Sequence, residues 1–201
     1  MRQPDTLIIK FEKASIVTVL AVILIRIWLG PESNFLLLVS TTTLSIYYLW
    51  FGFFIFTRHK PIDLLDRSVV QHIKPLHIYL SIIMGIIISY SLIAILFGFF
   101  FYPSTPVLLG SAFIILISFT LFLVAFQVIG KKRIALFHRF YYRAVLYTTI
   151  TALLWLIPLE TRLNLFFRNH EDFIEAYLYY SDNPDDEEAL ERLRTERSRF
   201  R

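Results

Sequence analysis

The sequence predicts an all-α protein, a multi-pass bundle of transmembrane helices. Of its 201 residues, 56% are hydrophobic and only 18% are charged, whereas soluble domains average about 25% charged residues. The charges are also unevenly spread, because residues 33–57, 75–130 and 144–159 contain no Asp, Glu, Lys or Arg. A helix needs roughly 20 mostly apolar residues to cross a membrane. These uncharged stretches exclude an ordinary soluble domain and indicate several membrane-spanning helices.

Five segments approach the length and apolarity of a span. Proline-containing turns at residues 30–34 and 102–106 separate the first four, because proline fixes φ, lacks a backbone donor and so ends helices. The fifth segment is the shortest of the set. The predicted spans are, in order, Ala14–Gly30, Phe35–Phe56, Ile78–Phe101, Val107–Gly130 and Ala144–Leu159.

The distribution of lysine and arginine predicts the orientation of these spans. Residues 1–13 hold three basic residues, residues 57–77 hold four and residues 131–143 hold five, while the two proline-containing turns hold none. Lys and Arg accumulate in the cytoplasmic loops of membrane proteins. The N-terminus and both basic segments are therefore expected in the cytoplasm, and the chain in a cell membrane or a bacterial inner membrane.

The C-terminal part differs in composition from the rest. The chain divides into a cytoplasmic N-terminal segment 1–13, a transmembrane domain 14–159 and a charged polar tail 160–201, which is expected to be helical and carries 18 of the 36 acidic and basic side chains. If the fifth segment spans, the tail faces outward; if that segment instead lies in the interface, the tail stays cytoplasmic. An interfacial helix requires one charged face, and the polar residues of the fifth segment do not form one. We therefore expect five spans.

An amphipathic helix is expected between the second and third spans. In residues 61–76, Ile62, Leu65, Val69 and Ile73 recur every three or four positions. Such a stripe is typical of one apolar helix face. The segment is predicted to lie on the cytoplasmic surface of the membrane.

Polar side chains inside the spans are the first candidates for function, because they are costly in hydrocarbon. Arg26 is the one charged residue within the predicted spans, and Thr41 and Ser45 fall near one face of the second span. One interpretation is that Arg26 extends its charged end to the headgroups while the hydroxyls bond between helices. The alternative is that all three line a pore or contact lipid.

Small residues in the third span indicate close helix packing. Ser81, Gly85 and Ser89 recur at intervals of four, which lets two helix backbones approach closely. The fourth span has small residues at intervals of seven, and the two stripes are expected to fit one another, within one chain or between copies. Those fourth-span residues are Ser111, Ser118 and Ala125.

Other chemistry is not indicated by the sequence. The chain has no cysteine, its histidines lack the i, i+4 spacing of helical metal ligands, and neither a phosphate-binding glycine loop nor a nucleophile elbow is present. The predicted spans contain no carboxylate, which argues against proton-coupled transport. We therefore expect no metal, no cofactor and no catalytic site.

These observations favour a non-enzymatic assembly or scaffold subunit of a membrane complex. Its expected partners are the lipid bilayer, other membrane protein subunits and, in an oligomer, further copies of the same chain. Nucleic acid is not expected, because most basic residues lie beside apolar spans and act as topology signals. The alternative is an oligomeric channel or transporter for a small solute.

Overall fold

The fold is all-helical, as predicted. A computed structural model describes residues 6–57, 73–102, 104–130 and 135–199, and none of these residues forms a strand. The elements are α1 (Thr6–Leu29), the short 3-10 helix η1 (Gly30–Ser33), α2 (Asn34–Thr57), α4 (Pro75–Phe100), α5 (Thr105–Gly130), α6 (Ala135–Leu156), α7 (Leu159–Phe166), α8 (Glu171–Asp182) and α9 (Glu187–Ser198).

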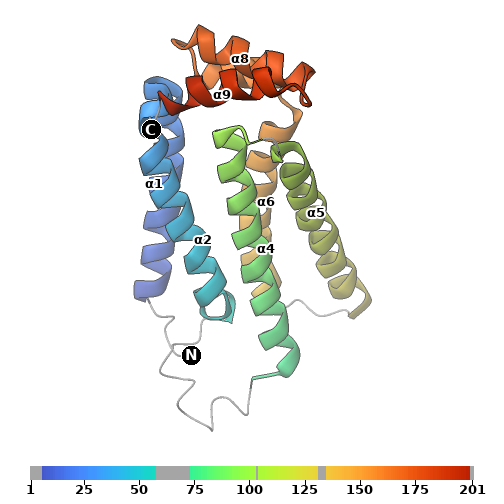
Figure 1. Ribbon diagram of the computed structural model, residues 1–201. Coiled ribbons are helices and arrows are strands. Elements are labelled where there is room, and N and C mark those ends of the chain that lie inside the picture. The colour runs from blue at the N-terminus through green and yellow to red at the C-terminus, as the bar shows by residue number, and fades with distance from the viewer. Residues whose placement is uncertain (1–5, 58–72, 103, 131–134, 200–201) are drawn as a thin grey trace.

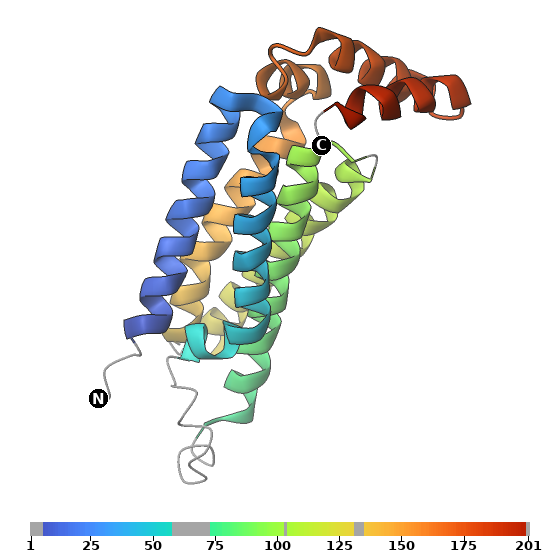
Figure 2. The same cartoon turned by 60° about the vertical axis from the view of Figure 1, so that its left-hand side comes forward.

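The long helices form a bundle with a cap at one end. Helices α1, α2, α4, α5 and α6 run side by side, and α8 and α9 lie across the end opposite the N-terminus (Figures 1 and 2). We use the name cap for residues 159–198, which comprise α7, α8 and α9. Helix α4 is the most enclosed of the apolar helices, because 67% of its apolar window is buried, compared with 28% for α5.

Three to four segments are long and apolar enough to cross a membrane, among the residues that the structure describes. Residues 7–57, α4 and α5 each satisfy that criterion. Helices α6 and α7 satisfy it when they are taken together as one segment, which is bent by 105°. The first stretch reverses direction at η1, so it contains two helices that lie side by side (Figure 2). Many large apolar side chains on the bundle are exposed, including Trp28, Trp50 and Val128. Such a surface suits contact with lipid.

Two left-handed residues end helices at the capped end of the bundle. Gly30 has φ +62° directly after α1, a conformation that glycine adopts without steric cost. Phe101 has φ +53° directly after α4 and is the one non-glycine residue with positive φ in the described chain. Both lie next to predicted proline turns, so the reversals occur where the sequence places them.

All five long helices begin before the predicted spans, and the difference is largest for α1 and α6. Helix α1 starts at Thr6 instead of Ala14, and α6 starts at Ala135 instead of Ala144. The predicted bounds followed hydropathy, whereas a helix continues through charged residues because Lys, Arg and Glu are good helix formers. The predicted surface helix at residues 61–76 lies outside the described residues as far as residue 72, and its last two residues begin α4.

Helices α2 and α4 touch through their backbones. A Cβ atom added to Gly85 would lie 2.6 Å from the Tyr48 carbonyl oxygen, and one added to Gly52 would lie 2.7 Å from the Gly85 Cα. Close by, the Ser45 hydroxyl bonds the Ser89 hydroxyl at 2.8 Å. The partner of the small-residue stripe in α4 is therefore α2 of the same chain, instead of the predicted fourth span.

Replacing Gly85 by Ala is expected to destabilise the bundle by roughly 1–3 kcal/mol, the usual cost of overpacking. The added methyl group has no room, because the obstructing atom is a backbone carbonyl. Thermal unfolding in detergent measures the effect. Gly130→Ala is the control, because no atom of the described residues lies within 4 Å of its added Cβ. Equal midpoints for the two variants would show that the backbones do not touch.

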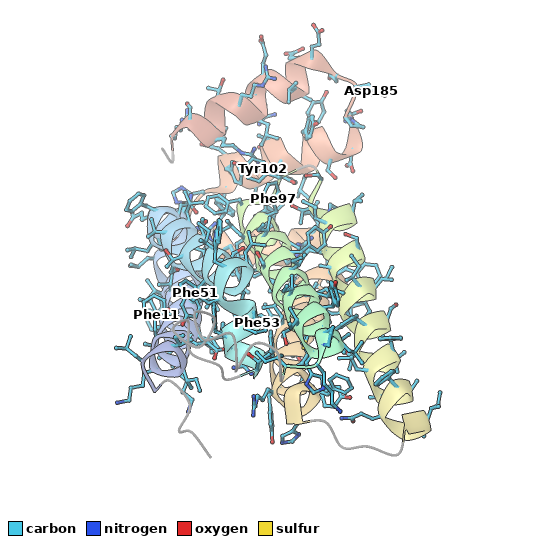
Figure 3. All side chains as sticks on the ribbon, turned by 90° about the horizontal axis from the view of Figure 1, so that it is seen from below. Phe11, Phe51, Phe53, Phe97, Tyr102 and Asp185 are labelled. Atoms are coloured by element: carbon cyan, nitrogen blue, oxygen red, sulfur yellow. The ribbon has the colours of Figure 1, made fainter. Side chains whose placement is uncertain are left out.

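Aromatic side chains cover much of the bundle surface and its junction with the cap. Figure 3 looks along the bundle and shows Phe11 of α1 near Phe51 of α2, while Phe97 and Tyr102 lie together at the end of α4. The Phe97 and Tyr102 ring centroids are 5.0 Å apart. Asp185 lies at the outer edge of the cap in the same view. Ring contacts of Phe99 and Phe101 with Phe166, Phe167 and Tyr177 join the bundle to the cap.

Candidate functional site

A buried ion pair joins α1 to α6 inside the bundle. Glu12 is almost fully buried, and the Arg143 guanidinium donates to both of its carboxylate oxygens, from Nε at 2.5 Å and from Nη2 at 2.6 Å. This two-point contact is the strongest geometry available to an arginine and a carboxylate. Arg143 also donates to the Arg139 carbonyl of its own helix and stacks over the Phe56 ring.

Two tyrosines extend the pair across the bundle into α2. The Tyr48 hydroxyl donates to the Glu12 carboxylate at 2.6 Å, and the Tyr147 hydroxyl lies 3.4 Å from the Tyr48 hydroxyl. Both tyrosines are buried, and their rings meet edge to face at 6.0 Å. The four side chains form one hydrogen-bonded cluster, here called the Glu12–Arg143 cluster, with members on α1, α2 and α6.

The cluster corrects one sequence-based conclusion. The predicted spans contain no carboxylate, but α1 begins before Ala14 and so brings Glu12 about 9 Å into the helix at 1.5 Å per residue. The long helices therefore do contain a buried carboxylate, and the expected absence of one no longer speaks against proton-coupled transport. The charge on Glu12 is nevertheless matched by Arg143, so the arrangement can clamp three helices together without leaving a net charge in the bundle.

One signal in the sequence could have revealed Glu12. Glu12, Val19 and Arg26 follow one another at intervals of seven, and all three are buried on the inner side of α1. Residues seven apart lie on the same helix face. A buried carboxylate and a buried arginine on that face predict partners on other helices, although spacing does not reveal which.

Arg26 is buried, which contradicts the expectation that it extends to the headgroups. Its Nη1 donates to the Gly30 carbonyl at 3.0 Å and its Nη2 donates to the Phe99 carbonyl at 3.1 Å. The guanidinium also lies 5.4 Å from the centre of the Phe167 ring in the cap. The negative ends of α1 and α4 therefore face this cation, as the helix macrodipole favours.

Thr41 and Ser45 lie in the packed interior of the bundle. Thr41 is buried, and its hydroxyl oxygen has no hydrogen-bond partner among the described residues. Ser45 donates to the Ser89 carbonyl at 3.1 Å. Ser81 donates back to the His77 carbonyl at 2.6 Å, in the same stripe of α4 as Gly85. Arg26, Thr41 and Ser45 are thus all buried within the bundle of this chain.

The end of α4 anchors the cap. The Phe101 carbonyl accepts hydrogen bonds from the Tyr177 hydroxyl and from Arg197 Nη2, both at 2.9 Å. The Phe101 ring contacts Phe167 at 5.5 Å and lies below the Arg162 guanidinium. Burial raises the pKa of Tyr177, while the nearby arginines oppose this shift. The tyrosine therefore keeps its proton for the bond to Phe101.

No metal centre is evident in the part of the chain that the structure describes, because no three metal-binding side chains come together there. Comparison with family models, with curated proteins and with solved structures finds no match for this chain. The geometry of its own residues therefore carries any functional conclusion.

Proposed function

We propose that the chain is a five-span, non-enzymatic subunit that assembles or scaffolds a membrane complex, with a cytoplasmic N-terminus and the cap on the opposite side. The five long helices run in one bundle, and the N-terminus and the cap lie at opposite ends (Figure 2). An odd number of spans separates the two ends of a chain across the membrane. The basic residues beside the N-terminal end favour the cytoplasm for that side.

The pairing of the buried polar groups supports a structural role. Glu12 is matched by Arg143 of α6, Ser45 is bonded to Ser89 of α4, and Arg26 donates to the Phe99 carbonyl of α4. In a channel or pump, such groups line water or a solute path. Here they hold helices of one chain to each other, which is what a rigid platform for partner subunits requires.

The cap offers the surface for those partners. Its inner side holds the buried Tyr177, Ala189 and Leu193, which pack within the cap and against the bundle. Its outer side exposes charged residues of α9 that form no ion pair within the described chain, namely Glu187, Glu188, Glu191 and Arg194. Complementary charge on a partner would give such a surface specificity.

A charge exchange on α9 tests this function. The variant Glu191→Lys with Arg194→Glu keeps the net charge and changes exposed side chains only. After gentle detergent extraction, affinity purification and mass spectrometry, we expect the wild-type chain to retain a defined set of membrane proteins and the variant to lose most of them. Lys10→Gln, exposed at the opposite end of α1, is the control and should retain the set.

An oligomeric channel or transporter is the second candidate, and one groove favours it. An apolar groove of about 490 Å³ lies between α5 and α6, with Ala144, Thr148 and Ala152 of α6 at intervals of four along it. Small residues at this spacing suit a helix from another copy. Solute flux in liposomes containing only this chain, together with unchanged partner binding in the α9 variant, would favour the channel over the scaffold.

A further inference from the structure

A cavity of about 330 Å³ lies where the bundle meets the cap. Its lining comes from the ends of α1 and α4, the start of α2 and the inner side of the cap. Its charged side chains are Arg26 from α1 and Arg197 from α9, and no acidic residue lines it. The cavity is therefore a positively charged site at one end of an apolar bundle.

Neither arginine is neutralised by a carboxylate among the described residues, since none lies within 4 Å of either guanidinium. Arg26 is fully buried, and its Nε finds no acceptor among residues 6–57, 73–102, 104–130 and 135–199. Arg197 donates to the Phe101 carbonyl and stacks over the Tyr102 ring. Helix C-termini supply only about half a negative charge each. A buried, unpaired cation is costly, so an anion in the cavity would stabilise it.

A neutral amide completes the polar wall. The Asn34 side-chain oxygen is buried and has no hydrogen-bond partner in the part of the chain that the structure describes. The amide offers two donors as well as an acceptor, and a half-turn of the group exchanges them. Arg26, Asn34 and Arg197 can therefore direct N–H donors from three helices toward one anion.

The apolar wall of the cavity continues onto the outside of the bundle. Phe35 and Leu38, both on α2, line the cavity, yet they are 72% and 44% exposed. On a membrane-spanning helix these side chains face acyl chains. An anion that enters from this side therefore carries an apolar part, as a lipid does.

We propose that this cavity binds the phosphate of an anionic phospholipid, with an acyl chain along Phe35 and Leu38. Arginine forms charge-assisted, two-point hydrogen bonds to phosphate. The site rests on insertion of the bundle in a membrane and is independent of the proposed scaffold role, because it involves the inner side of the cap and not the outer charges of α9.

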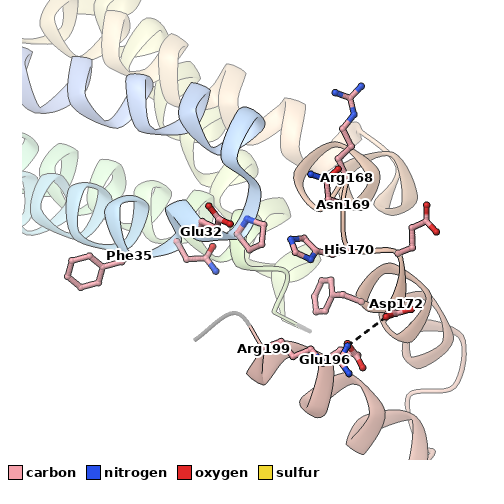
Figure 4. Close-up of a pocket in the computed structure, with 12 residues that line it drawn as sticks. Glu32, Phe35, Arg168, Asn169, His170, Asp172, Glu196 and Arg199 are labelled. Carbon is pink, nitrogen blue, oxygen red and sulfur yellow. Dashed lines mark hydrogen bonds and ion pairs between the residues drawn. The ribbon is translucent and has the colours of Figure 1, made fainter.

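The neighbouring groove predicts which anionic lipid fits. A polar groove of about 960 Å³ adjoins the cavity and shares Asn34, Phe35 and Phe173 with it. It holds four acidic residues and two arginines, a formal charge of −2. A second phosphate would be repelled there, so we expect a lipid with one phosphate and a hydroxyl-bearing headgroup. Figure 4 shows the labelled groove residues Glu32, Arg168, Asp172, Glu196 and Arg199.

Lipid-dependent stability of the purified chain tests the site. In delipidated protein in detergent, phosphatidylglycerol is expected to raise the unfolding midpoint, and phosphatidylcholine and inorganic phosphate are expected to raise it much less. Arg197→Gln should weaken phosphatidylglycerol binding roughly tenfold or more, the loss expected for a charge-assisted hydrogen bond. Arg192→Gln, on the same helix but outside the cavity, should bind like the wild type.

Two further variants separate binding from folding. Arg26→Lys keeps the charge but loses the two-point geometry, so we expect weaker binding in a folded chain. Leu38→Asn removes apolar surface at the entrance without adding charge, so it should weaken lipid binding while inorganic phosphate is unaffected. Equal stabilisation by inorganic phosphate and phosphatidylglycerol would overturn the lipid assignment, and phosphatidylglycerol binding unchanged in Arg197→Gln would overturn the site. Neither result depends on partner proteins.

Discussion

Replacing Glu12 by Gln, or Arg143 by Met, is expected to lower the free energy of unfolding by about 3–5 kcal/mol, the usual cost of leaving one member of a buried ion pair without its partner. Glu12 is almost fully buried and bonded to both Arg143 and Tyr48, so either change breaks contacts between helices far apart in the sequence. Denaturant or thermal unfolding in detergent measures the loss.

A double variant distinguishes a clamp from an independent role for each residue. Glu12→Leu with Arg143→Met should recover most of the lost stability, because a buried pair replaced by apolar groups of similar size is often neutral. The control is Glu175→Gln, which breaks the exposed 3.3 Å pair with Arg192 and should cost about 1 kcal/mol or less. A double variant no more stable than the single variants would contradict the clamp.

Replacing Phe101 by Ala should release the cap from the bundle. The ring is almost fully buried and contacts Phe166, Phe167 and Tyr177, and truncating such a phenylalanine costs about 3–5 kcal/mol. We expect trypsin to cleave the variant at cap arginines faster than the wild type, before the bundle unfolds. Phenylalanine and alanine are both non-glycine residues, so the substitution leaves the strain of a positive φ at position 101 unchanged. The loss of stability therefore comes mainly from lost packing.

Phe122→Ala is the control for this cap experiment. Phe122 is 53% exposed on α5, and its ring contacts Phe119 and Phe126 of the same helix. Cleavage of the cap should therefore stay at the wild-type rate. If both variants were cleaved alike, Phe101 would not be the anchor of the cap.

The sequence predicts the helical class and the turns because these depend on local composition. The uncharged stretches predict apolar helices, and Gly30 with Pro31 predicts the reversal at η1. Helix ends are predicted less accurately, since Lys10, Glu12 and Lys13 interrupt the apolar residues that follow Thr6 and move the predicted start of the first span to Ala14. Patterns of this kind depend on residues close together in the sequence, so they do not predict contacts between residues that are far apart in it.

The buried polar sites depend on such long-range contacts. Glu12 and Arg143 are 131 residues apart, and their pairing requires that α1 and α6 be neighbours. Arg26 lies near the end of α1, a position typical of an arginine that extends to the headgroups. It is buried because the cap folds back over that end, and no local pattern in the tail predicts this return.

The side of the membrane that the cap occupies is the most direct test of the proposed five-span subunit. The chain has no cysteine, so a single Asp185→Cys or Lys10→Cys substitution gives one exposed thiol at each end. In intact cells treated with a membrane-impermeant maleimide, we expect labelling at residue 185 and labelling at residue 10 only after the membrane is opened. Labelling of both positions only after opening, or of both positions in intact cells, would contradict five spans.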